Sequence, residues 1–143
     1  MIDRSLILQM TADVVIRTAT VFALFLLFRG HNAPGGGFVA GLVIVAGLMI
    51  RLVAVGWEGA RNSLPAPSEV IMGAGLTTAL LTGTAGWLWG DAFLEAAKVT
   101  LEVPVLGAIH LTSALVFDIG VFMVVVGMGA KLILSLAQTE NGP

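Results

Sequence analysis

Asp118 is the residue whose setting in the sequence most favours chemistry. It lies in the apolar stretch from Leu115 to Phe122, and no basic residue lies within two helical turns of it. A carboxyl group surrounded by apolar residues is a candidate proton carrier or a neutral hydrogen-bond donor. The alternative is a carboxyl group that only bonds a neighbouring helix. His110 precedes Asp118 by eight residues, about 12 Å along a helix axis, so we expect it on a similar flank but too far away to bond Asp118 directly.

Asp13 and Arg17 are a second pair of candidate ion-path residues. They are four residues apart in an otherwise apolar segment, so they share a helix face and are expected to form an ion pair. A lone charge at the centre of a membrane costs at least ~2.5–3.5 kcal/mol, which favours pairing. The pair either fixes the rotation of this helix against its neighbours or contributes to an ion path.

A glycine-rich stretch runs from Arg29 to Phe38, with the sequence Arg-Gly-His-Asn-Ala-Pro-Gly-Gly-Gly-Phe. Pro34 suits the first position of a helix, because its missing N–H would have no partner there. Three consecutive glycines each cost up to about 1 kcal/mol of helix propensity relative to alanine, and they are useful where another backbone approaches. We therefore expect a packed corner with Phe38 as an anchor, whereas a plain turn would need one glycine. The residues assigned to this corner are Arg29, His31, Pro34, Gly35, Gly36, Gly37 and Phe38.

The composition indicates an integral membrane protein. Of the 143 residues, 57% are hydrophobic and 11% are charged, and the mean hydropathy is +1.00, whereas about 25% of the residues of a soluble domain are charged. The net charge of −2 argues against nucleic-acid binding. There are no cysteines and only two histidines, so we expect no metal site and no cofactor. The sequence also contains no motif that places a nucleophile beside a base, so we do not expect an enzyme.

Apolar segments near 5–28, 36–56, 69–89 and 107–134 are each long enough to cross a bilayer of about 30 Å. They predict an all-α membrane protein with four antiparallel transmembrane helices in a single domain, 1–143. Strands are not expected, because these runs show no period-2 alternation. Charged residues scattered through 90–106 suggest a short amphipathic helix on the membrane surface before the last span. The first segment is too long and too charged for a cleavable signal peptide, so we expect it to remain as a span.

The basic residues predict the orientation of the chain. An inside N-terminus puts four of them, Arg4, Arg51, Arg61 and Lys131, on the inner side, against Arg29 and Lys98 outside. The positive-inside rule then places both termini in the cytoplasm. Small residues recur four apart at Gly37 and Gly41 and again at Ala79 and Gly83, a spacing that lets helices approach closely.

Two of these stretches carry a family resemblance over nearly the whole chain. The stretch from Arg29 to Phe38 resembles a signature of the MnhB/MrpB family, the B-type components of the Mrp-type multisubunit cation/proton antiporters. The stretch from Ala108 to Phe122, which contains His110 and Asp118, resembles the family's other signature around its last helix. The two motifs occur here in the same order as in that family.

The resemblance implies an accessory subunit in the bacterial cell membrane that exchanges sodium for protons together with other antiporter subunits. It implies that the subunit is needed for assembly, that Pro34 and Phe38 matter for function, and that the ion-path residues lie largely in other subunits. Asp118 therefore remains a candidate on its membrane burial alone. Besides partner subunits, we expect contacts with membrane lipids. The alternatives are a purely structural subunit, a homologous subunit of a membrane-bound hydrogenase or complex I-related redox pump, or an autonomous transporter.

Overall fold

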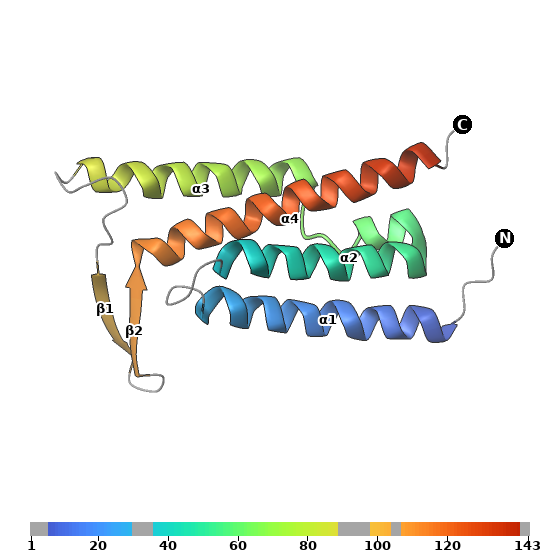
Figure 1. Ribbon diagram of the computed structural model, residues 1–143, viewed down its shortest axis with the longest axis horizontal. Coiled ribbons are helices and arrows are strands. Elements are labelled where there is room, and N and C mark those ends of the chain that lie inside the picture. The colour runs from blue at the N-terminus through green and yellow to red at the C-terminus, as the bar shows by residue number, and fades with distance from the viewer. Residues whose placement is uncertain (1–5, 30–35, 89–97, 104–106, 141–143) are drawn as a thin grey trace.

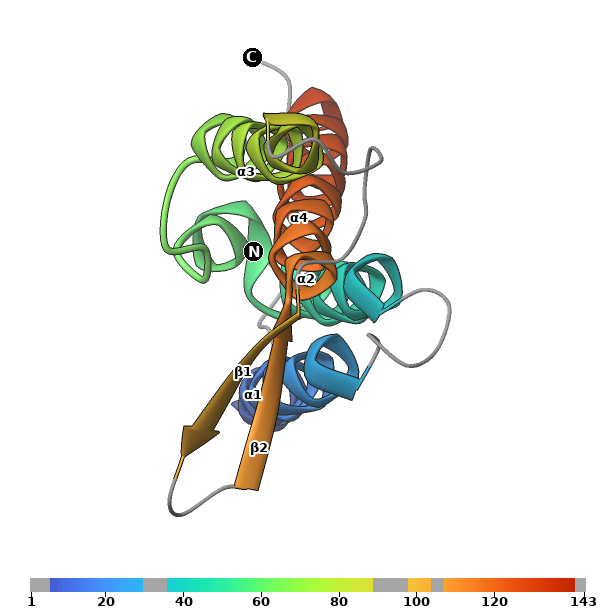
Figure 2. The same cartoon turned by 90° about the vertical axis from the view of Figure 1, so that its left-hand side faces the viewer.

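The computed structural model of the chain describes residues 6–29, 36–88, 98–103 and 107–140. It contains four helices, α1 (Leu6–Arg29), α2 (Gly36–Arg61), α3 (Ser68–Leu88) and α4 (Ser113–Glu140). Figure 1 shows that they lie side by side in the order α1, α2, α4, α3. The end-on view in Figure 2 places α4 between α3 and α2. The central pair is therefore α2 and α4, and each has one outer helix.

Each outer helix runs antiparallel to its inner neighbour, α1 to α2 and α3 to α4 (Figure 1). The start of α1 and the end of α4 consequently lie at the same end of the bundle. The helices fall within a few residues of the predicted apolar segments, apart from the end of α2 and both ends of α4. The four-helix part of the sequence prediction is confirmed.

Threonine hydroxyls in the outer helices are satisfied within their own helix. Thr77, Thr78, Thr82 and Thr84 of α3 each donate a hydrogen bond to the carbonyl group four residues earlier, at 2.8–2.9 Å. Three threonines of α1 do the same. Such internal bonds allow a hydroxyl group to face lipid without an unpaired donor.

α1, α2 and α4 are each long and apolar enough to cross a membrane. Large apolar side chains cover their outer surfaces, as at Val21 (70% exposed) and Leu132 (61% exposed). α3 has 21 residues and is not among the spans that length and composition identify in the described part of the chain.

α2 changes direction at Gly56, which has a φ of 85° and a ψ of −176°. This left-handed φ favours glycine, since a Cβ would clash with the backbone there. The sequence predicts that this segment ends at residue 56, whereas the helix continues for a further turn to Arg61 in a new direction (Figure 1).

The expected start of the last helix at 107 is wrong, and the expected amphipathic helix in 90–106 is not found in the described part of that stretch, 98–103; residues 90–97 and 104–106 lie outside the described residues. β1 (Lys98–Val103) and β2 (Gly107–Thr112) pair as an antiparallel two-stranded sheet, and α4 begins only at Ser113. The sequence Lys-Val-Thr-Leu-Glu-Val alternates polar and apolar residues with the period of a strand. The class is therefore mainly helical, with one hairpin at the end of the bundle where α4 begins (Figure 1). Because a two-stranded sheet has open edges, this hairpin belongs outside the hydrocarbon layer.

Candidate functional site: a glycine corner and an ion pair between helices

The start of α2 packs directly against α4. Gly36 and Gly37 are buried. A Cβ atom placed on Gly37 would lie 2.9 Å from the carbonyl carbon of Asp118 and closer still to its oxygen. Real Cβ atoms essentially never approach other atoms so closely, so the two backbones pass at a distance that only glycine permits. The expectation that the glycines admit a neighbouring helix is confirmed at this position.

The contact continues one turn along α2. A Cβ atom on Gly41 would lie 2.7 Å from the Cβ atom of Val125 and 3.3 Å from the carbonyl oxygen of Phe122. Ala40, on the same stretch, is fully buried in an apolar cluster with Ala23 and Leu27 of α1. Small residues of α2 thus bring α1 and α4 together at this end of the bundle.

Asp118 lies at the crossing itself and is partly buried. It is the sixth residue of α4, which begins at Ser113. Its backbone forms the contact with Gly37. The backbone of Asp118 is therefore held in place by its contact with Gly37.

Only part of the predicted corner belongs to the described structure. His31, Pro34 and Gly35 lie outside the described residues. Arg29 ends α1, and its guanidinium lies 5.6 Å from the centroid of the Phe25 ring. Phe38 is 52% exposed on the outside of the corner.

His110 does not share a helix with Asp118, contrary to expectation. It lies in strand β2, where the register sets it opposite Thr100. A spacing of eight residues therefore does not place the two on similar flanks. The prediction failed because it assumed that the helix begins at 107.

Asp13 pairs with Arg51 of α2, not with Arg17 as predicted. One Nη of Arg51 donates to a carboxylate oxygen of Asp13, and the Nε donates to the carbonyl oxygen of Gly59 at 3.3 Å. Arg51 thus joins α1 to the turn of α2 beyond the Gly56 bend. Arg17 is exposed, and the structure gives it no ion-pair partner among the residues described.

A shallow cavity of about 300 Å³ lies beside this ion pair. Its lining combines the three charged side chains with the hydroxyl groups of Thr20 and Ser63, and consists of Asp13, Ile16, Arg17, Thr20, Arg51 and Ser63. The ion pair is only partly screened from the surroundings, with side-chain exposures of 22% for Arg51 and 43% for Asp13. This arrangement can hold a charged or hydrated group at the side of the bundle.

The two groups of candidate residues contact α2 at positions far apart along the helix. Gly37 and Arg51 are 14 residues apart, which corresponds to about 21 Å of helix. A direct proton transfer from Asp118 to Asp13 is excluded by this separation, since a transfer requires hydrogen-bond reach or a bridging water. Within the described residues, no three His, Cys, Asp or Glu side chains are grouped so as to hold a metal ion.

Sequence reasoning missed Arg51 as the partner of Asp13. The signal that could have found it is the requirement that a carboxylate within a span meets a cation, for which Arg51 was the other candidate. Local spacing gave preference to Arg17, because the i,i+4 rule considers only one helix.

The bundle and its glycine-dependent crossing define a small, mainly helical membrane subunit, and the comparisons with known proteins identify its family. A family described as a domain related to the MnhB subunit of the Na+/H+ antiporter matches residues 7–131. The chain belongs to this family.

Individual relatives agree over almost the full length. The B subunit of the Na(+)/H(+) antiporter of Bacillus subtilis (strain 168) is 36% identical, and the alignment covers 92% of this chain and 98% of the relative. The protein of the same name from Alkalihalophilus pseudofirmus is 33% identical, and the alignment covers 90% of this chain and 94% of the relative.

A solved structure of the Mrp complex from Dietzia sp. DQ12-45-1b contains a similar fold. The similarity has a TM-score of 0.79 at 32% sequence identity and covers 95% of this chain. The present chain spans 14% of the length of the chain it matches there. The predicted resemblance to the MnhB/MrpB family is confirmed.

Proposed function

We propose that this chain is an accessory membrane subunit of a multisubunit monovalent cation (Na+)/proton antiporter. The observation that carries this proposal is the match to relatives named as B subunits of Na(+)/H(+) antiporters, over more than nine tenths of their own lengths. The likeness to part of an Mrp complex supports assembly with other antiporter subunits. On this proposal the chain is a component of a secondary transporter and not an enzyme.

The fold supports a role in positioning other components. α2 and α4 are joined through backbone contact at Gly37, while large apolar side chains remain exposed around the bundle. In a membrane, such surfaces are covered by lipid or by neighbouring subunits. The chain therefore presents a rigid crossing to its partners.

The membrane arrangement that we propose has four crossings in a single domain, 1–143, with both termini in the cytoplasm of a bacterium. On this proposal α3 is the fourth span, beside α1, α2 and α4. Two observations support it: the threonine hydroxyls of α3 donate hydrogen bonds to carbonyl groups of the same helix, and α3 packs against α4. The start of α1 and the end of α4 lie at the same end of the bundle, which agrees with an even number of membrane crossings (Figure 1).

Asp118 and the Asp13–Arg51 pair are the residues that we assign to ion movement, with Arg17 at the edge of the second site. Their separation along α2 favours two independent contacts with neighbouring subunits over one continuous path through this chain. The corner from Arg29 to Phe38, including Pro34 and Gly35, is assigned to docking.

Purification of the tagged full chain in a gentle detergent, followed by mass spectrometry of what co-elutes, tests this function. Co-elution of the large antiporter subunits is the expected result, and everted vesicles that lack this chain should lose sodium/proton exchange. Co-elution of nickel–iron or iron–sulfur proteins would instead identify the alternative, a homologous subunit of a membrane-bound hydrogenase or complex I-related pump. Transport by the purified chain alone in liposomes would contradict an accessory role.

A further inference from the structure

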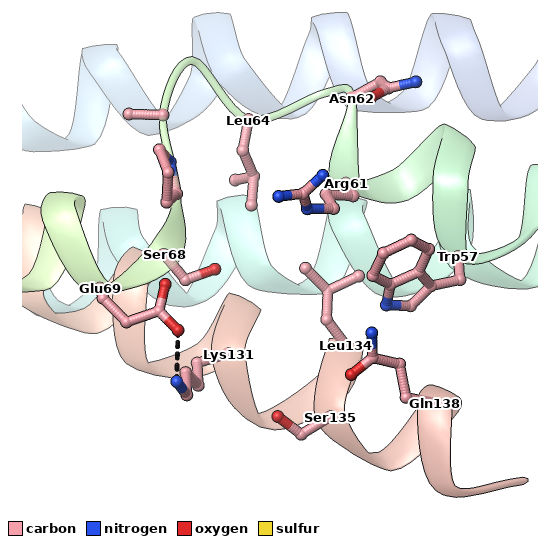
Figure 3. A pocket seen from close by; sticks show the side chains of 12 residues that line it. Trp57, Arg61, Asn62, Leu64, Ser68, Glu69, Lys131, Leu134, Ser135 and Gln138 are labelled. Carbon is pink, nitrogen blue, oxygen red and sulfur yellow. Dashed lines mark hydrogen bonds and ion pairs between the residues drawn. The ribbon is translucent and has the colours of Figure 1, made fainter. Parts of the chain in front are cut away.

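A second, larger pocket lies at the opposite end of the bundle from the glycine corner. It has a volume of about 590 Å³ and lies between the end of α2, the first turn of α3 and the later part of α4 (Figure 3). The residues that matter for its chemistry are Trp57, Arg61, Glu69, Lys131, Ser135 and Gln138. None of them belongs to the candidate sites described above.

The pocket carries one more positive than negative side chain. Lys131 donates a hydrogen bond to Glu69, so these two charges are paired, as the dashed line in Figure 3 shows. The guanidinium of Arg61 lies 5.5 Å from the centroid of the Trp57 ring. No ion pair of Arg61 is present among the described residues. The pocket thus offers a cation whose N–H donors are uncommitted.

Several side chains with hydrogen-bonding groups surround this cation. The indole Nε1 of Trp57 is buried and has no hydrogen-bond partner within the described part of the chain. A buried donor without an acceptor costs about 1–3 kcal/mol. Figure 3 shows this nitrogen on the edge of the ring that faces Gln138, whose amide, like the Ser135 hydroxyl, can also donate. A ligand with several acceptor oxygens and one negative charge fits these groups.

The position of the pocket indicates which kind of anion it can bind. α2 leaves its straight course at Gly56 and α3 begins at Ser68, so the pocket lies where helices enter and leave the apolar layer. Met128, Leu132 and Leu136 of α4 are 61–64% exposed at a spacing of four, and they form an apolar stripe beside the face of α4 that lines the pocket. An acyl chain can lie along such a stripe while its headgroup remains at the boundary.

We propose that this pocket binds the phosphodiester of an anionic phospholipid, with Arg61 as the main contact and Gln138 as a further donor, beside the ring of Trp57. The phosphodiester of such a lipid carries one negative charge, which the surplus charge of the pocket neutralises. The inference requires a membrane-embedded chain and is independent of the ion that the complex transports.

Quenching of Trp57 fluorescence by brominated lipids tests the proposal in the full chain. Trp87→Phe and Trp89→Phe leave Trp57 as the sole tryptophan. The protein is placed in nanodiscs of phosphatidylcholine that contain equal mole fractions of brominated phosphatidylglycerol or brominated phosphatidylcholine. A basic residue near anionic headgroups is worth about fivefold in affinity, so the anionic lipid should quench Trp57 preferentially.

Three variants separate binding from general effects. Arg61→Gln should remove most of the preference, Arg61→Lys should retain much of it, and Arg29→Gln, at the opposite end of the bundle, should leave it unchanged. Circular dichroism of each variant checks that the helices remain. Equal quenching by the two brominated lipids in the folded parent protein would overturn the proposal.

Two further experiments distinguish a lipid headgroup from a free anion. Inorganic phosphate should not reduce the quenching preference at ordinary buffer concentrations; if it does, the site binds free oxyanions and the lipid assignment is wrong. The same lipids, added to the purified complex, should remain bound to this chain in native mass spectrometry, and less so with Arg61→Gln. Loss of the difference between parent and variant in the complex would mean that a neighbouring protein fills the pocket.

Discussion

Gly37 of α2 and Asp118 of α4 are packed backbone against backbone. Any side chain at position 37 would occupy the space of the Asp118 carbonyl group, because a Cβ atom there would already lie 2.9 Å from the carbonyl carbon. Gly37 of the glycine-rich corner and the partly buried Asp118, which lie 81 positions apart in the sequence, are therefore parts of one contact. A side chain added at position 37 should therefore disturb the crossing, whereas a change of the Asp118 side chain should leave the backbone contact in place.

Gly37→Ala is expected to destabilise the crossing of α2 and α4. Overpacking of a filled interior typically costs about 1–3 kcal/mol, and here the obstructing atoms are backbone and cannot rotate away. Thermal unfolding of the purified chain, followed by circular dichroism, should show a lower midpoint, and less of the chain should be recovered with its partners.

Gly73→Ala is the matched control for this substitution. Gly73 is also a helical glycine, but a Cβ atom there would meet no other atom within 4 Å. Alanine is favoured over glycine in a helix by up to about 1 kcal/mol, so the control should be unchanged or slightly more stable. Equal destabilisation by the two substitutions would contradict the close contact at Gly37.

Asp118→Asn is expected to lower sodium/proton exchange while the complex still assembles. Asparagine has nearly the same size and leaves the backbone contact with Gly37 in place, but it cannot take up or release a proton. Exchange measured in everted vesicles should fall, with normal amounts of each subunit on a blot. Unchanged exchange would remove Asp118 from the mechanism and leave it a structural role.

Asp13 and Arg51 are expected to show energetic coupling in a double-mutant cycle. Residues that share an ion pair typically couple by about 0.5–3 kcal/mol. The single variants Asp13→Asn and Arg51→Gln should each lower thermal stability, and the double variant should lose less than their sum. The corresponding cycle of Asp13→Asn with Arg17→Gln should show weaker coupling. Stronger coupling of Asp13 to Arg17 than to Arg51 would instead support the ion pair that the local spacing predicts.

The Lys131–Glu69 pair should make stability depend on pH in the acidic range. Lys131 donates a hydrogen bond to the carboxylate and so lowers the pKa of Glu69, with the Arg61 charge contributing less. A carboxyl group whose pKa is lower in the folded state stabilises the fold above its unfolded pKa of about 4.3 and loses this effect as pH falls through the folded pKa.

The measurement compares the parent chain with Glu69→Gln from neutral to acidic pH. The parent should have the higher unfolding midpoint at neutral pH, and the difference should disappear in acid. Because Glu69 is 57% exposed, salt should also reduce the difference. A difference in unfolding midpoint that persists in strong acid would mean that Glu69 stabilises the fold through packing.

The positions of the helices could be predicted from the sequence because hydrophobic length alone specifies a helix in a membrane. The packed glycine corner could also be predicted, since three glycines in a helix have a cost that requires a compensating contact. The local sequence could not identify which helix packs against the glycine corner. That Gly37 meets Asp118 follows from the order α1, α2, α4, α3, which depends on all the helices together.

The errors have a common physical origin in reliance on local spacing. The shared helix face of Asp13 and Arg17 predicts a pair between them, whereas the actual partner, Arg51, is 38 residues from Asp13. The scattered charges of 90–106 and the apolar run from 107 favour helix in segment 98–112, although residues 98–103 alternate polar and apolar side chains and pair with 107–112. In both cases a contact between segments decides the outcome.

The two ion pairs of the described structure have a consequence for how the chain enters the membrane. Asp13–Arg51 joins α1 to α2 and Glu69–Lys131 joins α3 to α4, so each clasps the open end of one helical hairpin. We therefore expect each of these two helical pairs to enter the membrane with these charges already neutralised, and the contact between α2 and α4 at Gly37 and Gly41 to form afterwards.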